Sequence, residues 1–253
     1  MTLKLLKNPW DLIASQYDEQ FGNEGDYSHK FIIHPALLDI LGNIENKEIL
    51  DLGCGTGTFS RILARKKSKV IGTDYSKEMI SIALDKQDEY KFPSEYYISD
   101  ARKDFNFKDK SFDYILQIML LHSIGDKFLK NILSETFRTL RDNGECLIVI
   151  PHPFFTKEFK SIGYPIGDLY LSNYKTYFVW KQFNEICKSP TEFYLRPLEY
   201  YADLFESTGF VIKKIYEPKI VNTKEALNAK PHMFIRRREI PGFMIIKLVK
   251  LLL

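Results

Sequence analysis

The feature that most constrains this chain is a glycine-rich segment, Asp51-Leu52-Gly53-Cys54-Gly55-Thr56-Gly57. An apolar run typical of a buried strand, Glu48–Leu52, comes before it, and Thr58–Lys66, with apolar residues at helical spacing, follows. Glycines in a strand-to-helix turn let the backbone bend sharply and leave bare main chain for a ligand. The free amides of the helix N-terminus face the same cleft. The segment therefore predicts a ligand site where a strand ends.

Three acidic residues indicate the charge of that ligand. Asp51 stands two positions before the first glycine, where a carboxylate would repel a pyrophosphate but suits a cationic ammonium. Asp74 ends the next apolar run, and Asp100 follows the third. In open α/β sheets the carboxyl ends of the strands converge on the ligand crevice, so the three acids are expected to meet there.

Short apolar runs alternate with amphipathic stretches along the chain. Strands are predicted at 48–52, 69–73, 95–98, 112–118, 145–150, 210–217 and 242–249, and helices at 9–21, 58–66, 76–87, 126–140 and 197–207. Ser76 is a plausible N-cap of its helix, and Asp142-Asn143-Gly144 predicts a turn. The alternation predicts an α/β fold, a mostly parallel sheet with helices on both faces.

These motifs together resemble those of class I S-adenosylmethionine-dependent methyltransferases, in particular the group of small-molecule enzymes that includes the ubiquinone/menaquinone-type methyltransferases. The resemblance rests on DLGCGTG, the Asp74 position, the Ser99-Asp100-Ala101 step and FDYILQIMLLH, and it extends over residues 10–249. It implies a Rossmann-like seven-stranded sheet whose last strand is antiparallel. It also implies S-adenosylmethionine as the cofactor and S-adenosylhomocysteine as the product.

Carried over position by position, the resemblance gives a set of cofactor-binding residues. Asp51, Gly53, Cys54, Gly55 and Gly57 surround the methionine portion. Asp74 holds the ribose, with Tyr75 and Met79 beside it. Asp100 and Ala101 meet the adenine, Gln117 ends the strand beneath the sulfonium, and Tyr17, on the N-terminal helix, contacts the methionine end.

Two nucleotide-binding alternatives fit the glycine segment less well. A nicotinamide site needs G-x-G-x-x-G, and its third glycine would stand where the chain has Thr58. A phosphate-binding P-loop needs a Gly-Lys-Ser/Thr sequence, which does not follow here.

Methyl transfer mainly requires alignment of the two reactants and exclusion of water, so a general base is optional. Candidates for a catalytic role are His122, His152 and Tyr17. A histidine satisfied by a backbone carbonyl, or a helix that only packs on the sheet, is the alternative. His29 and His34 are interpreted as structural or pocket-lining, and no metal site is predicted.

The domain organisation follows from the order of the elements. We expect an N-terminal helical cap at 1–45, a cofactor-binding core at 46–150 and 196–253, and a substrate lid at 151–195. The lid segment holds twelve of the 36 aromatic residues, which would suit a flat or apolar acceptor but equally a satellite hydrophobic cluster. Arg236-Arg237-Arg238 would clamp an anionic acceptor or form a basic surface.

Composition limits the partners. A net charge of +3 does not by itself imply nucleic acid, and three well-separated cysteines predict neither a disulfide framework nor a metal site but a reducing cytoplasm. The apolar run at residues 242–253 is too short to span a membrane. We therefore expect methyl transfer to an oxygen or nitrogen of a small molecule. A peptide acceptor, a non-catalytic cofactor-binding protein and, less favoured, an RNA methyltransferase remain alternatives, and the oligomeric state stays open.

Overall fold

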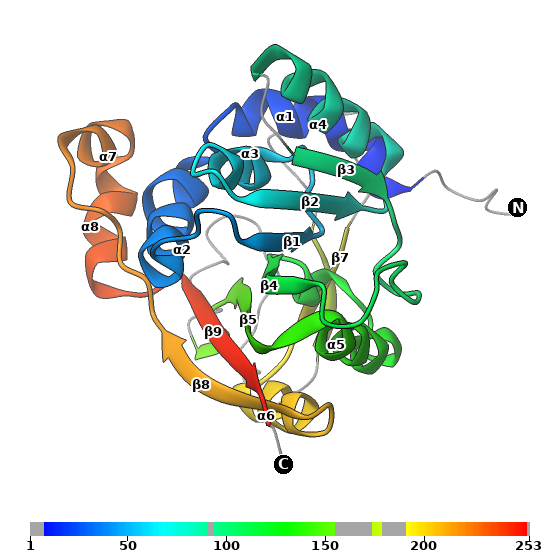
Figure 1. Ribbon diagram of the computed structural model, residues 1–253. Helices are drawn as coiled ribbons and strands as arrows, with labels where there is room; N and C mark the ends of the chain where they lie inside the picture. The colour runs from blue at the N-terminus through cyan, green and yellow to red at the C-terminus, as the bar shows by residue number, and fades with distance from the viewer. Residues whose placement is uncertain (1–7, 91–93, 155–173, 179–190, 252–253) are drawn as a thin grey trace, which may run out of the picture.

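A seven-stranded sheet forms the centre of the computed structural model, which describes residues 8–90, 94–154, 174–178 and 191–251 (Figure 1). Its strands are β1 (Glu48–Leu52), β2 (Lys69–Asp74), β3 (Ser94–Ile98), β4 (Phe112–Ile118), β5 (Leu140–Pro151), β8 (Phe210–Tyr216) and β9 (Phe243–Lys250), in the order β3-β2-β1-β4-β5-β9-β8. The pairs among β1 to β5 are parallel, and β9 is antiparallel to both of its neighbours. The predicted mixed sheet with an antiparallel last strand is confirmed.

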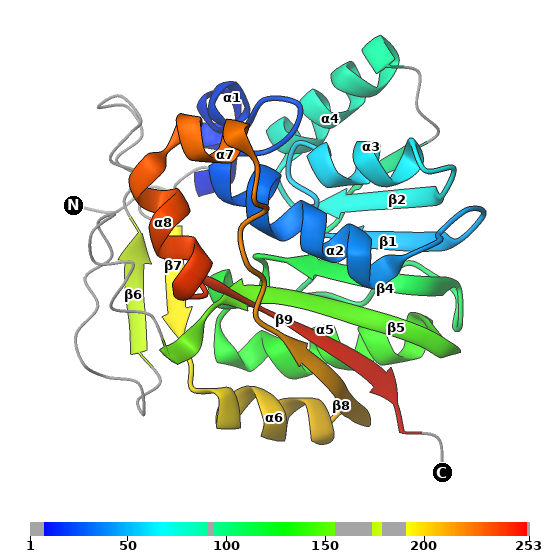
Figure 2. The same ribbon diagram turned by 90° about the vertical axis from the view of Figure 1, so that its left-hand side faces the viewer.

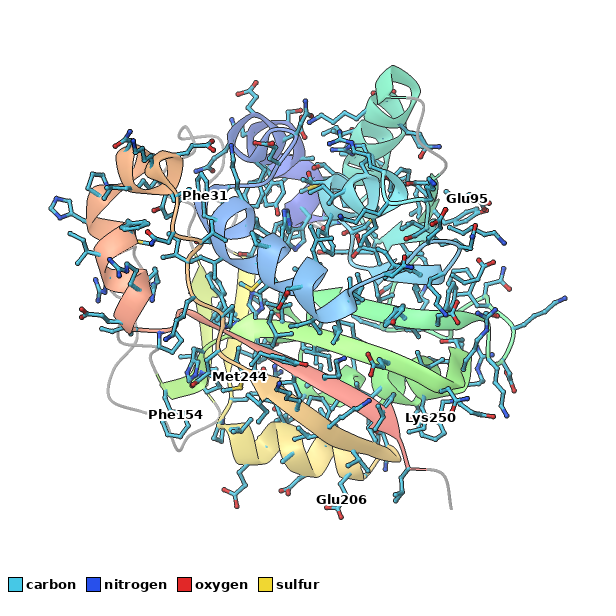
Figure 3. The ribbon with its side chains drawn as sticks, turned by 60° about the vertical axis from the view of Figure 1, so that its left-hand side comes forward. Phe31, Glu95, Phe154, Glu206, Met244 and Lys250 are labelled. Carbon is cyan, nitrogen blue, oxygen red and sulfur yellow. The ribbon has the colours of Figure 1, made fainter. Side chains whose placement is uncertain are left out.

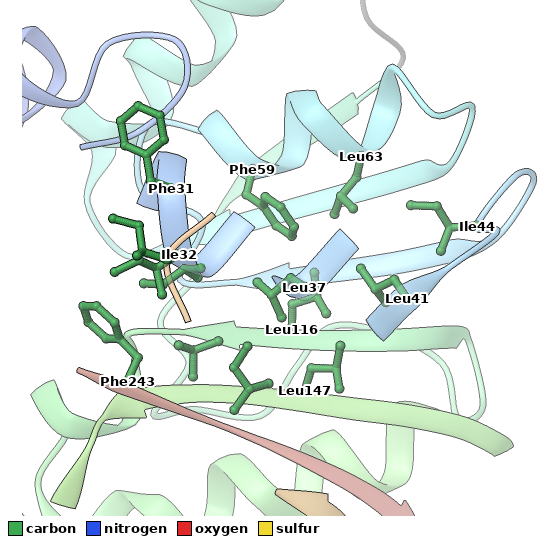
Figure 4. Close-up of a cluster of buried hydrophobic side chains, with 14 of the residues drawn as sticks. Phe31, Ile32, Leu37, Leu41, Ile44, Phe59, Leu63, Leu116, Leu147 and Phe243 are labelled. Atoms are coloured by element: carbon green, nitrogen blue, oxygen red, sulfur yellow. The ribbon is translucent and has the colours of Figure 1, made fainter. Parts of the chain in front are cut away.

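Helices cover both faces of this sheet. They are α1 (Pro9–Phe21), α2 (His34–Leu41), α3 (Thr58–Ala64), α4 (Lys77–Tyr90), α5 (Asp126–Thr139), α6 (Leu198–Glu206), α7 (Lys224–Ala229) and α8 (Pro231–Glu239), with a π-helix η1 (His29–Ile33) and a 3₁₀ turn η2 (Leu121–Ser123). Side chains of α2 and α3, including Leu37 and Phe59, pack on Leu116 and Leu147 of the sheet (Figure 4). Helices α5 and α6 pack on the opposite face, where Phe205 is fully buried.

Local sequence explains the ends of the elements that shape the crevice. The Ser76 hydroxyl accepts a hydrogen bond of 3.2 Å from the Met79 amide, which confirms the predicted N-cap of α4.

The apolar C-terminal run forms the buried strand β9 rather than a surface segment. None of the described helices is both long and apolar enough to cross a membrane.

The turn expected at residues 142–144 is wrong, because β5 begins at Leu140 and continues through it. Strand β5 shifts register against β4 between Phe112 and Tyr114. A Cβ on Gly144 would lie 2.9 Å from the Asp113 carbonyl oxygen, so the glycine marks a close approach of the two backbones. No helix was predicted between the last two strands, but the chain between β8 and β9 forms α7 and α8.

Part of the expected lid is a two-stranded antiparallel sheet of β6 (Tyr174–Phe178) and β7 (Thr191–Leu195), seen in Figure 2. The remaining lid positions, 155–173 and 179–190, with aromatic residues such as Phe155, Tyr164, Tyr170 and Trp180, lie outside the described residues. The division of the chain into a cap, a core and a substrate lid therefore stays a prediction.

Candidate functional site

A large cavity opens where the parallel strands end. Its volume is about 1330 Å³, beyond the roughly 300–1000 Å³ typical of a site for one small ligand. Figure 3 shows Phe31, which lines this cavity, and Phe154 toward the end of the sheet where the parallel strands finish, with Glu95 and Lys250 toward the other end. The site therefore has room for a cofactor and a second molecule.

Most of the predicted site residues meet at this cavity. Those that line it are Tyr17, Gly53, Gly55, Asp74, Tyr75, Met79, Asp100, Ala101 and His122. Beside it lies a smaller pocket of about 60 Å³, whose lining includes Asp51 and Cys54 and again Tyr17, Gly53 and Gly55. Cys54 packs against the cluster formed by Ile80, Ala83 and Tyr96.

The backbone angles of the loop and the contacts around it explain its three glycines. Gly53, Gly55 and Gly57 all have positive φ, between 55° and 78°. At Gly55 a Cβ would meet no atom within 4 Å, which leaves the main chain bare toward the cavity. At Gly57 a Cβ would lie 2.6–2.8 Å from the Tyr96 ring, and Gly57 lines neither pocket. Gly57 is therefore needed for packing of the loop, whereas Gly55 provides space for a ligand.

Two alanine substitutions separate these roles. Gly57→Ala should destabilise the protein by about 2 kcal/mol or more, because left-handed backbone strain of roughly 1–2 kcal/mol is joined by a clash with Tyr96. Gly55→Ala should carry the backbone strain alone, while its new methyl group narrows the ligand space. Chemical denaturation and titration with S-adenosylhomocysteine measure the two effects. Equal losses of stability in both variants would contradict the assignment.

Two carboxylates lie beside the loop, of which Asp51 is buried and Asp74 is partly buried. Asp51 is 2% exposed and accepts a 2.6 Å hydrogen bond from the Ser60 hydroxyl. Asp74 accepts hydrogen bonds from the Gly55 amide, at 3.0 Å, and from the Ser76 amide, at 2.9 Å. Burial raises the pKa of each carboxyl group to about 6. A bound cation or hydroxyl donor would therefore relieve an unfavourable negative charge at this place.

The third carboxylate is already paired with a residue that the sequence did not indicate. Asp100 accepts hydrogen bonds of 2.7 and 2.8 Å from the Arg102 guanidinium, and these outweigh burial and lower the pKa of Asp100. The guanidinium lies 5.3 Å from the centre of the Tyr75 ring and 5.5 Å from that of Phe128. Arg102 therefore belongs to the wall of the cavity around Asp100.

His122 lines the cavity but is a poor proton acceptor. It packs against Phe193 with ring centroids 4.7 Å apart, and within the described chain its Nδ1 has no hydrogen-bond partner. Burial, with a contribution from the positive charge of Arg196, lowers the pKa of His122 to about 3. The expected base role, which assumed a near-neutral pKa, does not fit this environment.

Two other expected residues lie away from the cavity. His152 Nε2 is 2.8 Å from a carboxylate oxygen of Glu217, and its Nδ1 accepts a hydrogen bond from the Phe154 amide. Gln117 is fully buried and donates to the Thr136 hydroxyl of α5 at 2.9 Å. Neither residue lines either pocket, so the geometry argues against a catalytic His152 and against a Gln117 side chain at the cofactor.

The basic run before the last strand lies on α8, and its middle member lines the cavity. Arg237 is only 5% exposed, and a Cβ at Gly242 would lie 2.8 Å from its Cζ. Arg238 is instead stacked near Phe234 on the same helix. A cation is thus present at the wall of the cavity formed by α8, where an anionic group of an acceptor would be attracted.

Comparisons with known proteins find methyltransferases among the proteins similar to this chain. Residues 49–144 match the family model described as a methyltransferase domain. An uncharacterised protein of Haemophilus influenzae is 26% identical over 84% of this chain and 89% of its own length. A demethylmenaquinone methyltransferase of Tropheryma whipplei is 30% identical over 119 residues, which is 47% of this chain and about half (48%) of that enzyme.

The same architecture recurs in solved structures. An S-adenosylmethionine-dependent methyltransferase from Mesorhizobium loti superposes with a TM-score of 0.66, at 21% identity, over 90% of this chain and 99% of its own. Residues 49–144 thus match a methyltransferase domain, and the fold of the chain is similar to that of solved S-adenosylmethionine-dependent methyltransferases. The family match and the fold support S-adenosylmethionine as the cofactor and S-adenosylhomocysteine as its product.

The residues present fit such a cofactor. Gly55 leaves open space at the loop, and the buried Asp51 and the partly buried Asp74 lie beside it, as a ligand with an ammonium, a sulfonium and a ribose diol requires. Nowhere in the described residues do three His, Cys, Asp or Glu side chains gather so that they could hold a metal ion.

Proposed function

We propose that this protein transfers the methyl group of S-adenosylmethionine to an oxygen or nitrogen atom of a small-molecule acceptor. The observation that carries the proposal is one large cavity that is lined both by Gly53, Gly55 and Asp74 and by aromatic residues. Its size exceeds one small ligand, so two reactants can meet in it.

The composition of the cavity wall suggests the kind of acceptor. Aromatic rings from several elements line it: Tyr27, Phe31, Phe128, Phe193, Tyr194 and Phe243. Lys127, Lys230 and Arg237 line it as well. These groups favour an aromatic acceptor, an anionic one, or one that is both.

The cofactor supplies a methyl group already activated by the sulfonium charge. The chain's own residues would bind and align the two molecules and keep water out. Asp51, Gly53 and Gly55 would hold the methionine portion, Asp74 the ribose, and Asp100 with Ala101 the adenine. Tyr17 of α1 would cover the methionine end, and Met79 and Tyr75 would pack beside the nucleoside. Residues 191–194 of β7, which line the cavity, would contact the acceptor.

Calorimetric titration tests the cofactor first. S-adenosylhomocysteine should bind the purified protein with micromolar affinity, while NADH and NADPH should not bind, because the loop lacks the third glycine of a dinucleotide site. A folded sample that binds none of them would contradict the proposal. Binding without transfer to any acceptor in a screen of phenols, amines, carboxylates and short peptides would favour a non-catalytic cofactor-binding protein.

A further inference from the structure

An aspartate–histidine pair faces the same cavity and has no assigned role. Asp26 and His29 both line the cavity, and His29 also lines the smaller pocket beside the glycine loop. The His29 Nδ1 lies 2.8 Å from Asp26 Oδ1, and the His29 backbone amide donates to the same oxygen at 2.9 Å. The carboxylate therefore fixes both the ring and the backbone of this histidine.

This contact determines the tautomer of the ring. An ionised carboxylate only accepts hydrogen bonds, so Nδ1 carries the proton. The hydrogen bonds and positive charge of His29 outweigh burial and lower the pKa of Asp26 to about 2, so Asp26 stays ionised. When His29 is neutral, the lone pair of its ring is on Nε2, for which no hydrogen-bond partner is found among the described residues.

Packing holds the pair in place. The His29 ring lies 5.1 Å from the Phe21 ring of α1 and 5.4 Å from the His34 ring of α2, measured between centroids. A Cβ at Gly25 would lie 2.5 Å from the His29 Cβ, so the glycine lets the loop before η1 pass close to the ring. Lys30 forms ion pairs with Glu24 and Glu225.

The other candidates for a proton acceptor at the cavity fit less well. His122 is buried beside the charge of Arg196, and His152 contacts Glu217 outside the cavity. Burial, with Asp26 and Asp74 nearby, raises the pKa of the Tyr17 phenol well above its usual value, so Tyr17 keeps its proton.

We propose that His29 is the general base of the reaction, accepting the acceptor's proton on Nε2, and that Asp26 is its positioning residue. The inference rests on the proposed methyl transfer. A lone pair of the acceptor oxygen or nitrogen forms a bond to the methyl carbon, and the carbon–sulfur bond breaks with its electrons remaining on sulfur. The acceptor's proton passes to Nε2, and the positive charge that leaves the sulfonium ends on the imidazolium beside Asp26.

A pair of matched probes tests the base. At about pH 8, 2-naphthol must lose a proton during methylation, whereas naphthalene-2-thiol, a more acidic group of the same shape, is already largely ionised. With saturating S-adenosylmethionine, His29→Gln should lower kcat for the naphthol by about 100-fold, within the usual contribution of a general base, and change the thiol reaction only a few-fold. Asp26→Asn should lower kcat for the naphthol by about 10-fold. Equal losses on both probes would overturn the proposal.

Two readouts do not depend on an acceptor. In the S-adenosylhomocysteine complex, nitrogen-15 spectra of the imidazoles should show His29 protonated at Nδ1, and protonation at Nε2 instead would overturn the proposal. S-adenosylhomocysteine affinity of His29→Gln should stay within about 3-fold of wild type, since a general base acts on the reacting proton and not on the bound cofactor. A large loss would make His29 a cofactor-binding residue instead.

His232→Gln is the matched control, because His232 is exposed on α8 and lines neither pocket. It should leave kcat for both probes and the affinity for S-adenosylhomocysteine unchanged. The experiments distinguish failure of the proposed function from failure of the role assigned to the aspartate–histidine pair. If the proposed function is wrong, the wild-type protein would neither bind S-adenosylhomocysteine nor methylate either probe, whereas failure of the His29 assignment alone would leave both intact.

Discussion

Replacing Asp51 with asparagine should make the ligand-free protein more stable near neutral pH and, at the same time, weaken its binding of S-adenosylmethionine. Asp51 is 2% exposed, and burial, with the nearby charge of Asp74, raises its pKa to about 6, although the Ser60 hydrogen bond opposes this. Asparagine has a similar shape and can still accept the Ser60 hydrogen bond, but it buries no charge.

The pH dependence gives the size and sign of this effect. Because the folded pKa of about 6 lies above the unfolded value, the folded state binds more protons between the two values. The free energy of unfolding of the wild type therefore falls as pH rises from about 4 to 6, by up to roughly 3 kcal/mol for this group. Asp51→Asn should remove that fall and gain about 2 kcal/mol near pH 7.5.

Urea denaturation at two pH values measures the gain, and calorimetry measures the loss of affinity, expected to be about 10-fold for a removed charge-assisted contact. Ser60→Ala is the control with the opposite sign, because it removes the one side-chain hydrogen bond to the buried carboxylate. A less stable Asp51→Asn variant near neutral pH would contradict the interpretation. A substitution that raises the free energy of unfolding but lowers ligand affinity is typical of a functional site.

The sheet and the glycine loop could be predicted because their signals are local. Most strands contain a short apolar run, and the predicted cofactor loop consists of seven adjacent residues, Asp51 to Gly57. The predictions of secondary structure that were wrong concern segments whose conformation depends on contacts with distant parts of the chain. The sequence 142–144 is typical of a turn, yet it lies within β5, at the register shift between the β4-paired residues Leu140 and Glu145. The helices α7 and α8 bury Ala226 and Phe234 against the core, and this packing carries little local pattern.

The direction of side chains on a strand was the harder part of the site. Successive residues on a strand point to opposite faces. Ile118 lines the cavity, whereas Gln117 points to Thr136 on the other face. An error of one residue in the alternation reverses which side chains face the cavity, so the sequence alone does not distinguish Gln117 from Ile118. The low pKa of His122 arises mainly from burial and, to a smaller extent, from the charge of Arg196, which lies 74 residues further along the chain. Similarly, nothing in the sequence distinguished His29 from the other histidines until its contact with Asp26 was known.

Replacing Asp74 with alanine should produce the largest loss of cofactor affinity. The carboxylate joins the glycine loop to the end of β2 through the Gly55 and Ser76 amides, and it would also accept hydrogen bonds from the ribose hydroxyls. Alanine would leave these amides without their acceptor and remove the contacts to the ribose. Charge-assisted hydrogen bonds contribute about 1.5–3 kcal/mol each, so affinity for S-adenosylhomocysteine should fall by at least about 10-fold and up to about 100-fold.

The same carboxylate should make cofactor binding depend on pH. Burial raises its pKa to about 6, so below that value Asp74 takes up a proton and loses part of its capacity to accept hydrogen bonds. Wild-type affinity for S-adenosylhomocysteine should therefore decline as pH falls below about 6, and this decline should be shallower in Asp74→Ala. Glu95→Gln, an equal change of charge at an exposed position of β3, is the control and should bind like wild type. Unchanged affinity in Asp74→Ala by calorimetry would remove Asp74 from the ribose site and leave it the structural task of holding the Gly55 and Ser76 amides.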